Sequence, residues 1–210
     1  MSTSETPRRV DRRSEFPKFQ PREAPPSFGG FVEAVRDLLD LSVAADADDA
    51  AYAAAAAQVR EAVDTLEPYR EVKEGDGPAN RVSDLPGRGS AMQTPWRMVK
   101  FDESGVRSLL RFRRAHVGGN NAAHGGMIAN VFDEHLGWIV YSGGHPLART
   151  AYLNVSYWRV APVGPELIVD GWVDRVEGRK IYVAATLSDQ EGNVLAECKA
   201  LMIGLLEHHV

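Results

Sequence analysis

The stretch that begins at His124 reads HGGMIANVFDEHLGW and carries residue types that could do chemistry. A histidine and two glycines stand directly before an apolar helical pattern that contains Asp133 and Glu134. Gly125 and Gly126 at the start of a helix would leave backbone N–H groups bare, and the positive end of the helix dipole would reinforce them. Such a helix end stabilises negative charge that develops during a reaction. Because a carboxylate can act as general base or nucleophile, these residues together predict chemistry at a carbonyl group.

Asp133 lies on a row of small side chains along the predicted helix. Ala129 stands four residues before it and Gly137 four residues after it, so another molecule can approach the carboxylate closely. Glu134 is the other candidate for the catalytic carboxylate. If it has no catalytic role, it is a charge on the helix face or at a dimer interface. A different line of the helix forms an apolar stripe that a sheet can cover, made of Met127, Ile128, Val131, Phe132, His135, Leu136, Ile139 and Val140.

One helix does not bring these groups together. Asp133 lies roughly 13 Å along the axis from the start of the helix, too far for both to act on one carbonyl. Two copies of the chain with antiparallel helices would place Asp133 of one copy beside Gly125 and Gly126 of the other. The sequence therefore predicts a site shared across a homodimer.

The segments around this helix predict the sheet that must hold it. After the helix the apolar pattern changes to period two in TAYLNVSYWRV, ELIVDGWVDRV, KIYVAATLSD and VLAECKALMIGLL, separated by tight connections rich in Gly, Pro and Asn. Before the helix, WRMVKF and VRSLLRFRR read as two strands joined by DESG. Consecutive strands around one helix indicate an antiparallel sheet wrapped on that helix, an α+β fold.

Three segments divide the chain. Residues 1–27 are rich in Arg, Pro, Ser and Glu and are expected to form a flexible arm. Residues 28–94 are expected to hold two helices, FVEAVRDLLDL and an alanine-rich helix opening at Asp46, followed by an irregular linker. Residues 95–210 hold the main domain. The role of the two helices stays open among a lid, an interface and an appendage.

Composition excludes several classes of protein. The chain has 210 residues and a net charge of −5, whereas general nucleic-acid binding needs a basic excess, so no nucleic-acid partner is expected. No apolar run approaches the length of a membrane-spanning helix. Cys198 is the single cysteine, which excludes an intramolecular disulfide and suits a cytoplasmic location. His116, His135 and His145 show no ligand spacing, so no metal is expected.

Several motifs in order resemble a known family. They are HGGMIANVFDE, with the aspartate nine residues after the histidine, RTAYLNVSYWRVAPVG, VDRVEGRKIYVAATL and VLAECKALMIG. They resemble the hotdog-fold acyl-CoA thioesterases of the phenylacetyl-CoA type, especially the long-chain acyl-CoA branch. The resemblance implies a sheet of five or six strands around the central helix, paired into a dimer or a dimer of dimers. It also implies hydrolysis of an acyl-CoA substrate to acid and coenzyme A, in fatty acid metabolism, without a cofactor.

The resemblance assigns roles to individual positions. Asp133 is similar to the family's catalytic carboxylate, and Thr150 falls where a hydroxyl orients the attacking water. Gly125 and Gly126 resemble the turn that binds the oxyanion. His124 resembles the neighbouring histidine that positions this turn and contacts the thioester.

Other positions depart from the family pattern or extend it. Many relatives have asparagine six residues before the histidine, where this chain has Gly118, and Asn120 or Asn121 could substitute for it. Arg179 and Lys180 flank a predicted hairpin and could hold coenzyme A phosphates by charge-assisted hydrogen bonds.

Two alternative functions stay open. A hotdog enoyl-thioester hydratase would use a histidine against a carboxylate, and His124 with Asp133 could imitate that pair. A non-catalytic acyl-CoA binding or regulatory module would bind the same ligand without turnover.

Overall fold

The computed structural model describes residues 22–70 and 77–205, which fall into two compact units. A helical unit lies within residues 22–92, and a sheet unit lies within residues 93–205. Most of the expected arm, residues 1–21, lies outside the described residues, as do residues 71–76 and 206–210. No helix in the described ranges has the length and apolar character needed to cross a membrane.

The helical unit contains two long helices, α1 (Phe28–Ala44) and α2 (Asp49–Leu66), with the 3-10 turn η2 (Glu67–Tyr69) after α2. The alanine-rich helix begins a few residues later than expected. Asp48 caps it, since its carboxylate accepts the N–H of Ala51 at 2.8 Å. The first residues of the unit belong to it rather than to a free arm, because the N–H of Arg22 donates to the carbonyl of Arg81 at 2.9 Å.

A buried arginine on α1 forms hydrogen bonds with the irregular segment that follows the two helices. Arg36 is only 2% exposed, and its guanidinium donates to the carbonyls of Pro86 and Ser90, both at 2.8 Å. The same guanidinium also contacts the Glu33 carboxylate. Pro86 is the first residue of the turn η3 (Pro86–Gly89) and Ser90 follows it, so the guanidinium satisfies backbone acceptors at both ends of the turn.

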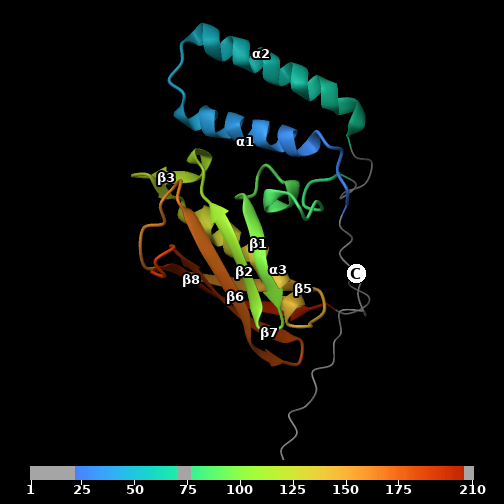
Figure 1. Ribbon diagram of the computed structural model, residues 1–210, viewed down its shortest axis with the longest axis vertical. Coiled ribbons are helices and arrows are strands. Elements are labelled where there is room, and N and C mark those ends of the chain that lie inside the picture. Colours follow the sequence, from blue (N-terminus) through green and yellow to red (C-terminus); the bar gives the residue numbers. More distant parts are fainter. Residues whose placement is uncertain (1–21, 71–76, 206–210) are drawn as a thin grey trace, which may run out of the picture. The chain divides into compact units, whose positions relative to one another are not determined.

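The sheet unit is a six-stranded antiparallel sheet with one long helix, α3 (Gly125–Ser142) (Figure 1). The strand order is β1-β2-β6-β7-β8-β5. The strands are β1 (Trp96–Asp102), β2 (Gly105–Arg111), β5 (Ala148–Tyr157), β6 (Glu166–Glu177), β7 (Lys180–Ser188) and β8 (Val194–Gly204). Between β2 and α3 lie the turn η4 (Arg114–His116) and a small hairpin of β3 (Val117–Gly119) and β4 (Ala122–Ala123).

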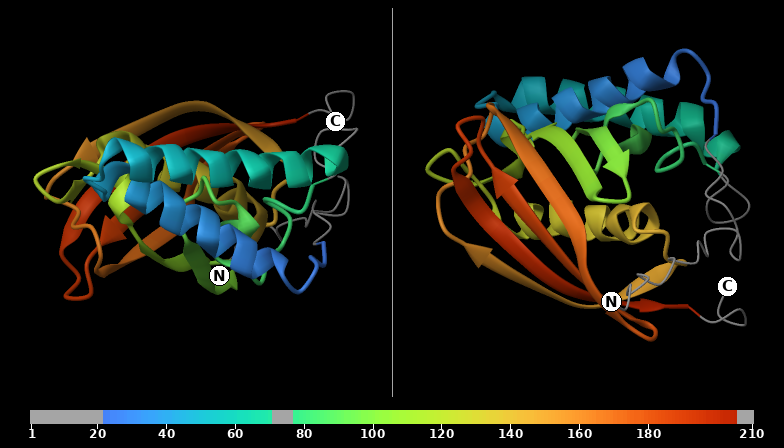
Figure 2. Two further views of the ribbon diagram at one scale, coloured as in Figure 1. Left: turned by 90° about the horizontal axis from the view of Figure 1, so that it is seen from above. Right: turned by 60° about the horizontal axis from the view of Figure 1, so that its bottom comes forward.

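The sheet curves around α3, as Figure 2 shows within this unit. The predicted apolar stripe of α3 is buried except for Met127, which is partly buried. Phe132, Leu136 and Ile139 are fully inaccessible, and the stripe packs on alternate residues of β6, β7 and β8. Helix and sheet approach closely at Gly171, where an added Cβ would lie 2.2 Å from the Cδ1 atom of Ile139. The predicted antiparallel sheet around one helix is confirmed.

Candidate active site

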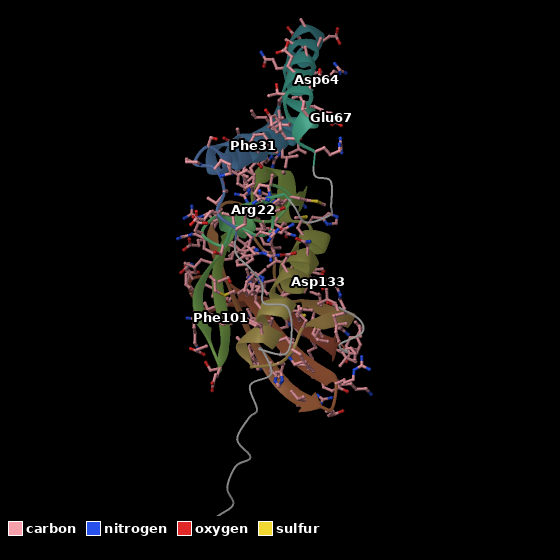
Figure 3. All side chains as sticks on the ribbon, turned by 90° about the vertical axis from the view of Figure 1, so that its right-hand side faces the viewer. Arg22, Phe31, Asp64, Glu67, Phe101 and Asp133 are labelled. Carbon is pink, nitrogen blue, oxygen red and sulfur yellow. The ribbon has the colours of Figure 1, made fainter. Side chains whose placement is uncertain are left out.

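Thr150 and Asp133 meet on the face of α3 that is not covered by core side chains. Asp133 is exposed on α3 (Figure 3), and the Thr150 hydroxyl donates to its Oδ1 atom at 3.0 Å. Thr150 lies on β5, the edge strand beside β8, and its Oγ1 also lies 3.4 Å from the sulfur of Met202 on β8. The sheet thus holds a hydroxyl against an accessible carboxylate, which can accept a proton from a molecule arriving from outside.

Cys198 on β8 lies within the electrostatic reach of Asp133. Burial and, second to it, the negative charge of Asp133 together raise the pKa of the Cys198 thiol to about 12. The thiol is therefore protonated at neutral pH and is not a nucleophile.

His124 caps the start of α3. Its Nδ1 atom accepts the N–H of Gly126 at 3.0 Å, and its carbonyl accepts the N–H groups of Met127 at 2.9 Å and Ile128 at 3.2 Å. Within the described residues the N–H of Gly125 has no acceptor. Because Nδ1 accepts, the neutral ring in this geometry carries its proton on Nε2.

One of the two N–H groups that the sequence predicts to be bare is occupied in the structure. Gly125 and Gly126 were both expected to present bare N–H groups, but the imidazole of His124 occupies the Gly126 donor. The reason is that a histidine at the N-cap can fold back onto the second N–H of its own helix, which a sequence pattern does not reveal. Gly125 is left as the available donor of the first turn.

Tyr157, at the end of β5, contacts the same helix start and was missed in the sequence. Its hydroxyl donates to the carbonyl of Gly125 at 2.9 Å, and its ring lies 3.4 Å from where a Gly125 Cβ would be. In a regular strand Thr150 and Tyr157, seven residues apart, would face opposite sides. A bulge between Thr150 and Tyr152 shifts the register, so that both residues face α3.

Gly118, where relatives have asparagine, is constrained by the backbone behind the histidine. A Cβ at Gly118 would lie 2.9 Å from the Cα of His124, so a larger residue requires a backbone shift. Asn120 and Asn121 have left-handed φ values of 48° and 56° and form the turn between β3 and β4. The side chain of Asn121 is exposed there, and the Asn121 carbonyl accepts the N–H of Val163 at 3.2 Å.

Arg179 lies in the connection between β6 and β7, and Lys180 is the first residue of β7, at the end of the sheet where β5 begins. The Arg179 Nε atom donates to the carbonyl of Gly204 at 2.9 Å, so one donor of its guanidinium is already used. Lys180 pairs with Ile203, which also pairs with Arg149 on β5. Met202, the residue before Ile203, pairs with Thr150. The row formed by Arg149 and Lys180 is therefore one residue along the strands from the pair of Thr150 and Met202. The sequence offered no signal for Arg149, because its neighbours depend on strand register.

The structure does not bring Asp133 and Gly125 together within one chain. They lie eight residues apart on α3, which is roughly 12 Å of helical rise. The other histidines serve the fold: His135 is buried with Nδ1 2.7 Å from the Val131 carbonyl, and His116 Nδ1 accepts the N–H of Arg113. In residues 22–70 and 77–205 no group of three or more His, Cys, Asp or Glu side chains is arranged to hold a metal ion.

An antiparallel six-stranded sheet wrapped around one central helix, with a carboxylate on the open face of that helix, defines a hotdog domain. A solved thioesterase superfamily protein has this fold, with a TM-score of 0.71 and 21% identity, over 88% of this chain and 97% of that chain. The match is longer than the sheet unit alone, so it extends into the helical unit.

The sequence model of the thioesterase superfamily matches residues 120–196 of this chain. Acyl-coenzyme A thioesterase THEM4 of Mus musculus is 36% identical over 83 residues, which are 39% of this chain and 35% of that protein. The same enzyme of Xenopus laevis is 36% identical over 84 residues, 39% of this chain and 37% of that protein. The chain thus covers just over a third of the length of these curated relatives.

Proposed function

We propose that this protein hydrolyses acyl-CoA thioesters to a free acid and coenzyme A. The observation that carries the proposal is the hydrogen bond of 3.0 Å from Thr150 to Asp133 on the exposed face of the central hotdog helix. Two relatives that carry the name acyl-coenzyme A thioesterase are 36% identical to this chain over 83 and 84 residues, which supports the same substrate class.

In the proposed reaction, Asp133 removes a proton from a water molecule, or attacks the carbonyl itself. Thr150 donates to one oxygen of Asp133 and so leaves the other oxygen to face the reactants. In the general-base form, the water oxygen bonds to the thioester carbonyl carbon, and the C–S bond then breaks. The proton passes to the leaving thiolate, so that the products are a carboxylic acid and the coenzyme A thiol.

The proposed oxyanion donor is the N–H of Gly125 in the second subunit of a homodimer. The negative charge that develops on the carbonyl oxygen needs a donor near 3 Å, and within one chain the helix rise keeps Gly125 roughly 12 Å from Asp133. Antiparallel packing of two α3 helices supplies the missing donor. His124 is proposed to hold the turn through Gly126 and to present its Nε2–H towards the thioester.

The proposed phosphate contacts are the basic residues at the start of β5. Lys180 and Arg149 flank Ile203 in the register of three neighbouring strands, and Arg179 lies beside Lys180. Their charges suit the phosphates of coenzyme A. Asn121, in the exposed turn before α3, is proposed as a further polar contact to the substrate.

Thiol release from a panel of short, long and aromatic acyl-CoAs tests the function. Asp133→Asn should lower turnover by at least about a hundredfold, since the carboxylate loses its basicity. Glu134→Gln is the matched control on the neighbouring position and should retain activity. Loss of activity in Glu134→Gln with retention in Asp133→Asn would overturn the assignment of the carboxylate.

Two further readouts separate the rival functions. Hydration of an enoyl-CoA without thiol release would identify a hydratase. Tight acyl-CoA binding with no turnover of any panel member would identify a non-catalytic binding module.

A further inference from the structure

A single peptide group at the start of α3 is held from both sides. The carbonyl of Gly125 accepts the phenol O–H of Tyr157 at 2.9 Å. The N–H of Gly126, which belongs to the same peptide group, donates to Nδ1 of His124 at 3.0 Å. Rotation of this peptide breaks both hydrogen bonds, so the first turn of the helix has one orientation.

This arrangement decides which donor is left for a ligand. The N–H groups of Met127 and Ile128 bond to the carbonyl of His124, and the Gly126 N–H bonds to the imidazole. Of the first four donors of the helix, only the Gly125 N–H has no acceptor within residues 22–70 and 77–205. Because helix N–H groups are aligned with the axis, the direction of this donor depends on the orientation of the turn that Tyr157 and His124 hold.

Tyr157 is tied to the proposed chemistry through β5. The bulge in β5 turns both Thr150 and Tyr157 towards α3, so one strand contacts the carboxylate at one point and the helix start at another. The ring of Tyr157 is 52% exposed, while its Cζ atom lies 3.4 Å from the position of a Gly125 Cβ. Its contribution to the core is therefore small, and its hydrogen bond goes to the functional turn.

We propose that Tyr157 is a positioning residue that aims the Gly125 N–H at the thioester oxyanion through the Gly125–Gly126 peptide. The inference rests on the proposed thioesterase function and adds a residue to which the resemblance assigned no role. Because the hydrogen bond acts on the donor for developing charge, its loss slows turnover and leaves ground-state binding of the acyl-CoA nearly unchanged.

Tyr157→Phe tests the inference, since it keeps the ring against Gly125 and removes only the hydroxyl. We expect kcat to fall roughly tenfold with KM within about twofold of the unmodified protein. Tyr152→Phe on the same strand is the matched control, because the Tyr152 hydroxyl has no hydrogen bond to any described residue. It should leave both constants unchanged.

Binding of two unreactive analogues separates positioning from a general structural role. A phosphinate analogue, with PO2− in place of the carbonyl and CH2 in place of the sulfur, mimics the charged tetrahedral oxyanion, whereas a ketone analogue, with CH2 in place of the thioester sulfur, mimics the ground state. Tyr157→Phe should weaken the phosphinate several-fold and leave the ketone nearly unchanged. Equal weakening of both, or unchanged kcat in Tyr157→Phe, would overturn the inference.

Failure of this inference is distinguishable from failure of the proposed function. An unmodified protein that releases no thiol overturns the function, whereas an active protein with an inactive Asp133→Asn and an unaffected Tyr157→Phe overturns only the role of Tyr157. Thermal unfolding of each variant sets an assay temperature at which all of them are folded.

Discussion

Thr150 and Asp133 are 17 residues apart in the chain, yet the Thr150 hydroxyl donates to the Asp133 carboxylate at 3.0 Å. Thr150→Val keeps the shape of the side chain and removes the donor, so the carboxylate loses its orientation. We expect kcat for acyl-CoA hydrolysis to fall about tenfold or more, because a hydrogen bond to a charged group contributes roughly 1.5–3 kcal/mol. Thr150→Ser retains the hydroxyl and should keep most of the activity. Equal rates for the valine and serine variants would contradict this role.

Gly125→Pro removes the proposed oxyanion donor without opposing the helix. Proline is favoured at the first position of a helix, and His124 already has the extended backbone, φ −62° and ψ 133°, that a residue before proline adopts. We expect turnover to fall by about a hundredfold or more. Gly125→Ala places a similar Cβ near Tyr157 but keeps the N–H, so it should be far less impaired. Circular dichroism of both variants checks that the fold is retained.

Mixing two inactive variants tests whether the site is shared between subunits. In a mixed dimer of Asp133→Asn and Gly125→Pro, one site carries both changes and the other carries neither. Random exchange of subunits should restore about a quarter of the original activity, since half of the dimers are mixed and each has one intact site. Thiol release before and after subunit exchange measures this, and no recovery in verified mixed dimers would mean that Asp133 and Gly125 do not serve a common site.

Cys198 should be inert to alkylation in the folded protein. Its side chain is 1% exposed and burial raises the pKa of its thiol to about 12, so the reactive thiolate is scarce at pH 8. Unfolding in urea should expose the Cys198 thiol, so that iodoacetamide labels it rapidly, and mass spectrometry detects the label. Labelling of the native protein at the rate of the unfolded protein would contradict the buried position.

The raised pKa of Cys198 also predicts a dependence of stability on pH. The unfolded thiol ionises near its ordinary value of 9.0, whereas the folded thiol stays protonated until about 12. The folded state therefore binds more protons in this interval, and its stability falls as the pH rises from 9 towards 12. Cys198→Ala should flatten this part of the profile in urea unfolding, and a profile identical to that of the unmodified protein would contradict the prediction.

Arg36→Met should loosen the segment after the helices in the helical unit. The substitution leaves the carbonyls of Pro86 and Ser90 without their charged donor, which costs roughly 2–4 kcal/mol. Limited proteolysis and hydrogen exchange should report faster opening between residues 77 and 92. Arg60→Met, at an exposed position of α2, is the control and should leave this segment protected.

The chain's local patterns were sufficient for the elements that surround the site. The helical spacing after His124, the small residues around Asp133 and the period-two strands are properties of neighbours in sequence, and they predicted α3 and the strands that wrap it. Burial supports these patterns directly, because the same apolar stripe of α3, including Phe132 and Leu136, fills the core.

Only the tertiary structure reveals the contacts between residues that are distant in the chain and the hydrogen bonds between side chains and backbone groups. The bulge in β5 turns Tyr157 towards Gly125, the imidazole of His124 takes the Gly126 donor, and strand register sets Arg149 beside the row of Lys180. Hydrophobic periodicity determines which face of an element is buried. It carries no information about a one-residue shift in register or about the acceptor that a given N–H finds, since both depend on the packed arrangement of several elements.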